Sequence, residues 1–218
     1  MSWSRANPLA SVTNLTRYPV VFGLTGTIIA LSLAQQALQS TWVLYTSYRY
    51  AWTSLQNGLS LALVGVVAAV VQGGLIRTLI PRLGERRAVM LGLGISIVTY
   101  LLYGLASQGW MMYAIIFIGG LGAISIPATQ GLMSRQVGPS EQGSLQGSLT
   151  SLVSLCGIIG PLVATWLFGH FTGPHAIVEV PGIAFFLGAT LNIVALALAV
   201  RSFTRLRDVD PVITPASR

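Results

Sequence analysis

Three glutamine side chains stand close together in a stretch of sequence that is otherwise apolar. When Gln35, Gln36 and Gln39 are placed on an α-helix with Trp42 and Ser32, all five fall within an arc of about 120°. Amide groups inside hydrocarbon need hydrogen-bond partners, because the hydrocarbon offers none. Two interpretations stay open: hydrogen bonds to neighbouring helices, or the wall of a water-filled cavity that holds a polar, partly aromatic solute.

Other apolar stretches contain single polar residues that could contact the same solute. Gln72, Ser96 and Gln130 each stand alone in such a stretch, so each is a candidate binding residue and also a candidate for a structural hydrogen bond. Asn192 is a similar case, and a lone amide of this kind is more typical of a structural hydrogen bond than of a ligand contact.

Small residues recur at every third position between Ser148 and Gly160, and Pro161 follows them. Small side chains let helices approach each other closely, and proline loosens the helix that contains it. We expect close packing along this stretch. The alternative is a hinge at Gly157, Gly160 and Pro161.

The composition predicts that these stretches lie in a membrane. The chain has 218 residues, of which 53% are hydrophobic and 8% are charged, whereas a soluble domain is about 25% charged. A soluble enzyme, a disordered chain and a disulfide-rich secreted module are therefore excluded. A helix needs about 20 apolar residues to cross the bilayer. Six stretches approach or exceed that length: Val20–Tyr45, Leu59–Ile80, Ala88–Ala106, Trp110–Met133, Gly147–Phe168 and Pro181–Val200.

The arginines predict the orientation of these six spans. The chain has twelve basic residues and no lysine; eleven fall at the ends that share a side with both termini, and only Arg49 lies opposite. Because basic residues concentrate on the cytoplasmic side, we expect both termini in the cytoplasm and the chain in the plasma (inner) membrane. Residues 1–17 would form a linker-like segment, 18–201 the bundle and 202–218 a tail. The arginines are spread over short gaps and do not cluster, so the expected partners are the lipid bilayer and a small molecule, not nucleic acid.

Two loops on the predicted cytoplasmic side carry complementary charges. The loop from Pro81 to Arg87 places Glu85 among three arginines, and the loop from Ser134 to Gly143 carries Arg135. Arginine and carboxylate groups can form paired hydrogen bonds, so a latch between the two loops is a hypothesis. Simple retention of positive charge in the cytoplasm is the alternative.

The residues give little support to intramembrane enzyme chemistry. A serine protease needs a histidine within hydrogen-bond reach of its nucleophile. His170 and His175 are the chain's two histidines, and both fall at or beyond the outer end of the fifth span. The sequence suggests no metal site and no cofactor, and the single Cys156 excludes an internal disulfide.

The segment from Leu83 to Gly92 resembles the second-half loop motif of the major facilitator superfamily, in its tetracycline-resistance branch of drug:proton antiporters. Further segments are similar to this branch in the same order, and the resemblance extends from Asn7 to about Val200. These segments are Asn7–Leu9, Trp42 with Arg49–Trp52, Gly109–Met111, Pro127 with Gln130, Ser134–Val137, Gln142–Gly147 and Gly160–Leu162.

The resemblance implies an all-α membrane fold in which six transmembrane helices form one half, a 3+3 inverted repeat, of a twelve-helix transporter. It implies transport of a small molecule, as drug or multidrug efflux by alternating access, with a second six-helix half as partner. The alternative is a truncated or non-transporting remnant, or a partner that modulates a full-length transporter. The cytoplasmic gate would contain Arg82, Gly84, Glu85, Arg86, Arg87, Arg135, Gln142, Gly143 and Gln146.

One position departs from the family pattern. Tetracycline pumps of this branch carry an intramembrane aspartate where this chain has Ser96. The resemblance therefore implies that any proton-coupling acid belongs to the other half, and it weakens the expectation that tetracycline is the substrate. Gln36 and Gln72 match glutamines of the branch, which favours the cavity interpretation.

Overall fold

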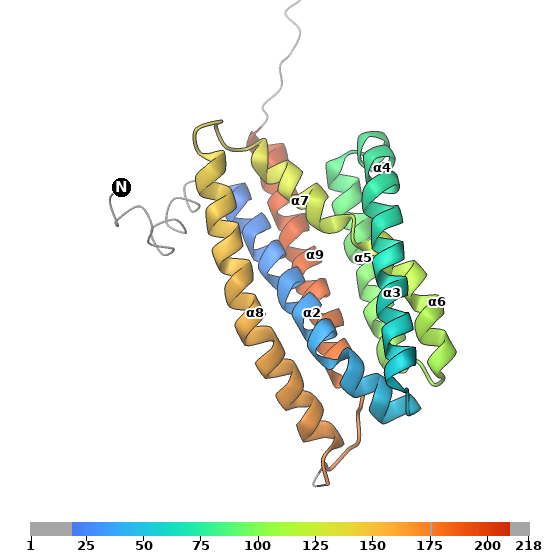
Figure 1. Cartoon of the computed structure of the whole chain (residues 1–218). Coiled ribbons are helices and arrows are strands. Elements are labelled where there is room, and N and C mark those ends of the chain that lie inside the picture. The colour runs from blue at the N-terminus through green and yellow to red at the C-terminus, as the bar shows by residue number, and fades with distance from the viewer. Residues whose placement is uncertain (1–18, 175, 210–218) are drawn as a thin grey trace, which may run out of the picture.

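The computed structural model describes residues 19–174 and 176–209, and the regular structure in these ranges is entirely helical (Figure 1). Six of its helical segments are long and apolar enough to cross a membrane. The helices are α2 (Pro19–Tyr50), α3 (Ser54–Val70), η2 (Val71–Leu75), α4 (Ile76–Leu83), α5 (Glu85–Leu105), α6 (Gly109–Gly122), α7 (Ser125–Ser134), α8 (Gln142–Thr172) and α9 (Ile183–Val209). The prediction of a six-helix membrane fold is confirmed.

The helices extend further than the predicted spans. The loop predicted between the second and third spans is mostly helical: Pro81 and Arg82 belong to α4, and Glu85 already begins α5. Pro81 removes only one backbone donor, so α4 continues to Leu83. Gly84 then turns the chain with φ 78°, a conformation that costs glycine little.

Two of the six spans are interrupted near mid-length. In the second span, η2 is a π-helical turn in which the Ile76 amide donates to the Val71 carbonyl, one residue further back than in an α-helix. In the fourth span, α6 ends at Gly122 and α7 begins at Ser125. The sequence analysis treated both spans as continuous.

The packing of the six spans follows a two-fold pattern. The first span, α2, packs against the sixth (α9) and the fifth (α8), while the fourth span, α6–α7, packs against the third (α5) and the second (α3). The third and sixth spans also pack against each other. Exchanging spans one to three with spans four to six leaves this set of contacts unchanged, as expected for an inverted repeat of three helices.

Both ends of the described chain lie at one end of the bundle, where α2 begins and α9 ends (Figure 1). This agrees with an even number of spans; the compartment at that end stays a prediction. The predicted segment 1–17, with its Asn7–Leu9 motif, lies outside the described residues. Helix α9 continues beyond Arg201 to Val209, so it includes the first part of the predicted tail.

Glycines allow the closest contacts between helices. A β-carbon on Gly188 of α9 would lie 2.2 Å from Tyr100 Cδ1 of α5, and one on Gly23 of α2 would lie 2.1 Å from Ser202 Oγ of α9. Real side chains cannot approach so closely, so the helix spacing at these points depends on glycine. Membrane helices pack through such small residues because lipid supplies no hydrophobic force between them.

We predict that Gly188→Val lowers stability, because the Tyr100 ring fills the space that the valine needs. Overpacking of this kind costs about 1–3 kcal/mol. Gly94→Ala is the matched control: a β-carbon there meets nothing within 4 Å, and alanine favours a helix over glycine by up to about 1 kcal/mol. Thermal unfolding in detergent should show a lower midpoint for Gly188→Val and an equal or higher midpoint for Gly94→Ala. Equal midpoints for the two variants would contradict the proposed role of Gly188.

Candidate functional site

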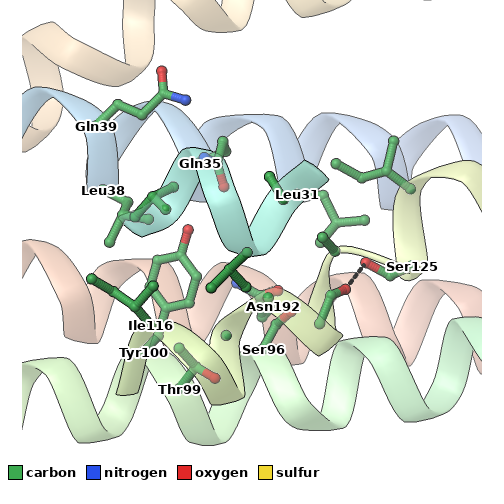
Figure 2. A pocket seen from close by; sticks show the side chains of 18 of the residues that line it. Leu31, Gln35, Leu38, Gln39, Ser96, Thr99, Tyr100, Ile116, Ser125 and Asn192 are labelled. Atoms are coloured by element: carbon green, nitrogen blue, oxygen red, sulfur yellow. Dashed lines mark hydrogen bonds between the residues drawn. The ribbon is translucent and has the colours of Figure 1, made fainter. Parts of the chain in front are cut away.

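A cavity of about 830 Å³ lies between α2, α3, η2, α5, α6 and α7 (Figure 2). Its volume falls within the range of pockets that hold drug-sized ligands. Both helix interruptions border it, η2 through Gln72 and the α6–α7 break through Gly122 to Pro127. Ligand sites of transporters often form at such discontinuous helices.

The structure brings most of the predicted binding residues together around this cavity. Helix α2 contributes Gln35, Gln39 and Trp42, and the cavity is also lined by Gln72, Ser96 and Gln130 from three further elements. Gln35 and Gln39 are exposed, so their amides face the open part of the cavity, whereas Trp42 is only 4% exposed. That these residues bind a solute stays a prediction.

Gln36 lies apart from the other two glutamines. A β-carbon on Gly157 would be 2.8 Å from its Nε2 atom and one on Gly160 would be 2.7 Å from its Cβ atom, which places Gln36 against α8. It lines a second cavity of about 420 Å³, together with Gln146 and Gln130, and Gln130 borders both cavities. On the helical wheel Gln36 is at the edge of the polar arc farthest from Trp42, and it faces the neighbouring helix α8.

The lack of hydrogen bonds to the three glutamine side chains bears on the choice between helix-to-helix bonding and a water-filled cavity. Among the described residues, the side chains of Gln35, Gln36 and Gln39 make no hydrogen bond to another residue. Helix-to-helix hydrogen bonding therefore does not account for them in this structure. An unpaired amide is costly in hydrocarbon, so their position at cavities favours a water-filled space.

The inner part of the main cavity is aromatic and uncharged. Trp42 meets Tyr103 edge to face with 5.2 Å between ring centroids, and Tyr100 lines the same wall. The Trp42 indole N–H donates to Ser60 Oγ at 3.0 Å, so this donor is satisfied within the protein. None of the described residues around the cavity is acidic or basic. The surface suits an amphipathic ligand with aromatic or apolar parts.

Several lining residues were missed by the sequence analysis. Thr99, Tyr100 and Tyr103 follow Ser96 by three, four and seven residues, so all of them lie on one face of α5. This spacing was a signal that could have identified them. Asn192 is the one described residue of α9 that reaches the cavity. It is 1% exposed, and its Oδ1 atom has no hydrogen-bond partner among the described residues. A buried acceptor left unpaired costs about 1–3 kcal/mol.

An ion pair connects the two segments for which a latch was hypothesised. Arg135 Nη2, just after α7, lies 3.1 Å from Glu85 Oε1 in the first turn of α5. The side chain of Glu85 is 14% exposed and that of Arg135 is 75% exposed. A carboxylate at a helix N-terminus is also stabilised by the helix dipole. The contact is present, while its role in gating stays a prediction.

The other predicted gate residues make varied contacts near this pair. The Gln142 amide donates to the Ser134 carbonyl at 3.4 Å and so joins the start of α8 to the end of α7. The Arg86 guanidinium lies 6.0 Å from the Phe203 ring centroid, a cation–π distance. The remaining members are exposed: Arg82, Arg87, Gly84, Gly143 and Gln146.

The predicted hinge residues lie within one continuous helix, α8. Gly157 and Gly160 form the surface against which Gln36 packs, which supports the packing interpretation of these small residues. Pro161 lies inside the helix, and its carbonyl accepts a hydrogen bond from Thr165 Oγ1 at 2.6 Å. A hinge motion at these positions stays a prediction.

The fold, the interrupted helices and the uncharged cavity together describe a multi-pass membrane protein with an internal cavity. The family model of the Major Facilitator Superfamily matches residues 20–217, and the chain belongs to this family. The six helices form one half of the family's fold.

Curated relatives of the chain include bacterial and human proteins. It is 33% identical to the class C tetracycline resistance protein of Escherichia coli over 190 residues, 87% of this chain and 47% of the relative. It is 35% identical to the class G tetracycline resistance protein of Vibrio anguillarum over 79% of the chain and 43% of the relative. Hippocampus abundant transcript-like protein 1 of Homo sapiens is 30% identical over 78% of the chain and 34% of the relative. The chain spans about half the length of the first two relatives, or less.

The cavity predicts a difference in thiol reactivity that depends on water. In a Cys156→Ser background, we expect Gln39→Cys to react with N-ethylmaleimide at least roughly tenfold faster than Val98→Cys, because the reaction needs a thiolate in water. Val98 is the matched control: it is 51% exposed but does not line the cavity, so in a membrane it meets lipid. Labelling rates measured in membrane vesicles provide the check. Similar rates for the two cysteines would contradict a water-filled cavity.

Proposed function

We propose that this chain forms one six-helix half of a drug efflux transporter of the plasma membrane, with both termini in the cytoplasm. The cavity beside Gln35, Gln39 and Trp42 carries the proposal, because it has the volume of a drug-sized site and combines amide groups with an aromatic wall. Family membership supports membrane transport. Two relatives are named for tetracycline resistance, which supports a drug as the substrate.

Alternating access is the proposed mechanism. A second six-helix half would cover the open side of the cavity, and rocking of one half against the other would expose the ligand first to one side and then to the other. Gln35 and Gln39 would bind polar groups of the ligand, and Trp42 would contact its apolar part. Ligand binding shifts such an equilibrium only through a difference in affinity between the two states.

The ion pair between Glu85 and Arg135 is the proposed latch of the cytoplasmic gate. It joins the third span to the fourth, at the end of the bundle where α2 begins and α9 ends. Among the described residues that line the cavity there is no carboxylate that could carry a proton. In an antiport mechanism, the proton-carrying group would therefore come from the second half.

Drug accumulation tests the proposal. We expect an efflux-deficient bacterium to accumulate less ethidium or tetracycline when it produces this chain together with a candidate first half, such as the first six helices of the class C relative. Gln39→Ala should weaken this effect, whereas Thr190→Val, on an exposed face outside the cavity, should not. Unchanged accumulation with and without the first half, with insertion verified, would overturn the transport proposal and favour a partner that modulates another transporter. Normal efflux by Gln39→Ala would overturn only the binding site.

The latch predicts that reversing both charges compensates for reversing one. Glu85→Arg should reduce efflux by roughly two- to fivefold, since an exposed ion pair contributes about 0.2–1 kcal/mol and the reversal also adds repulsion from Arg135. Combining it with Arg135→Glu should restore part of the activity, because the pair forms again with its charges exchanged. Rates of ethidium efflux from preloaded cells measure both effects. Equal activity of the single and double variants would show that the pair is not a latch.

A further inference from the structure

The structure assigns a second role to the main cavity: Asn192 and its neighbours form a hydrogen-bond-accepting subsite for an uncharged donor group, such as a hydroxyl, of the bound ligand. This inference rests on the proposed function, because it specifies which chemical group of the ligand lies deepest in the cavity. It concerns α9, which otherwise contributes no described residue to the cavity lining.

The Asn192 amide is oriented by a hydrogen bond within its own helix. Its Nδ2 atom donates to the Gly188 carbonyl at 2.8 Å. A carbonyl oxygen accepts hydrogen bonds only from a donor, so the atom that faces it must be the amide nitrogen. Oδ1 is the other end, and it is the one buried side-chain nitrogen or oxygen atom without a partner in the described part of the chain.

Two hydroxyl groups of the lining do not supply the missing proton. Thr99 Oγ1 donates to the Ile95 carbonyl at 2.8 Å, and Ser125 Oγ donates to the Gly122 carbonyl at 2.9 Å. Their protons are used by backbone carbonyls, so their oxygens present lone pairs to the cavity. Figure 2 shows Ser96, Thr99 and Asn192 on the side of the cavity away from Gln35 and Gln39. The Thr99 and Ser125 oxygens and Asn192 Oδ1 are therefore acceptors in the cavity lining whose hydrogen bonds a ligand could supply.

The charges around the subsite disfavour an ammonium group as the donor that bonds Asn192 Oδ1. Bringing a cation into a membrane interior without a counter-ion is costly, and the described lining residues contain no carboxylate. An uncharged donor forms the missing hydrogen bond without that cost. We therefore infer a neutral hydroxyl, phenol or amide N–H on an amphipathic ligand, with its apolar part against Tyr100 and Tyr103.

A matched pair of probes tests the inference on the full chain in detergent. The probes are 7-hydroxy-4-methylcoumarin and 7-methoxy-4-methylcoumarin at pH 6, which differ in the donor and the added methyl group, and binding is measured by fluorescence polarisation. We expect the ratio of the methoxy Kd to the hydroxy Kd to fall roughly three- to tenfold in Asn192→Leu, because the variant loses one hydrogen bond to the hydroxy probe. Thr190→Val is the control on the same helix: its hydroxyl also bonds the carbonyl four residues back but lies outside the cavity, so its ratio should match the unmodified chain.

Thermal unfolding separates this role from a structural one. Leucine has nearly the shape of asparagine and removes the unpaired acceptor, so Asn192→Leu should unfold at the same or a higher temperature. A lower unfolding temperature with an unchanged Kd ratio would overturn the inference and make Asn192 a structural residue. If the leucine variant does not fold, Asn192→Ala is measured by the same criterion.

Two further results would also overturn the inference. The unmodified chain could bind both coumarins equally, as it would if Ser96 or water satisfied Oδ1, or it could bind neither above the level of empty micelles. These outcomes differ from failure of the transport proposal. If the chain lowers drug accumulation but Asn192→Leu leaves the Kd ratio unchanged, transport is supported and the subsite is not. If Asn192→Leu lowers the Kd ratio but drug accumulation is unchanged, the subsite is supported and transport is not.

Discussion

Hydrogen-bond satisfaction in a medium without water is the constraint on which this structure depends. The backbone meets it by forming helices throughout the described spans. Most hydroxyls within the spans meet it by donating to a carbonyl of their own helix, as Thr41 and Thr129 do at 2.6 and 2.7 Å. The groups that do not meet it are concentrated at the cavities, where Gln35, Gln39 and Asn192 all lie. Polar groups left without protein partners thus mark the region that a solute or water would occupy.

The six spans could be predicted from the sequence because span length follows directly from bilayer thickness, and the family resemblance implied the inverted repeat; the orientation indicated by the arginines stays a prediction. The ends and interruptions of the helices were not predicted. Pro81 indicates a loop by its usual preference, but at this position it costs α4 only one hydrogen bond. The break after Gly122 follows three glycines and precedes Pro127, which has no N–H for the Ala123 carbonyl; this signal was present in the sequence but was not used.

The site could be predicted only in part, since periodicity gives the direction of a side chain but not its neighbour. A wheel with 100° per residue placed Gln36 with Gln35 and Gln39, yet helix α8 packs against Gln36 and places it in another cavity. Asn192 was interpreted as a structural amide, and half of that interpretation holds because Nδ2 bonds to Gly188. Whether Oδ1 finds a partner depends on the side chains of α5 and α7 near it, and the sequence of α9 alone does not give these neighbours.

The π-helical turn has a consequence for the register of the second span. A turn of this kind holds one residue more than an α-helical turn, and each residue of a helix adds about 100° of rotation. Everything from Ile76 to Leu83 is therefore rotated relative to the α-helical path of α3. If the same residues formed an uninterrupted α-helix, Arg77 and Arg82 would lie about 100° further around its axis. The single surplus residue in η2 thus determines which way the charged end of this helix faces, and so whether its guanidinium groups meet phospholipid headgroups or the neighbouring helices.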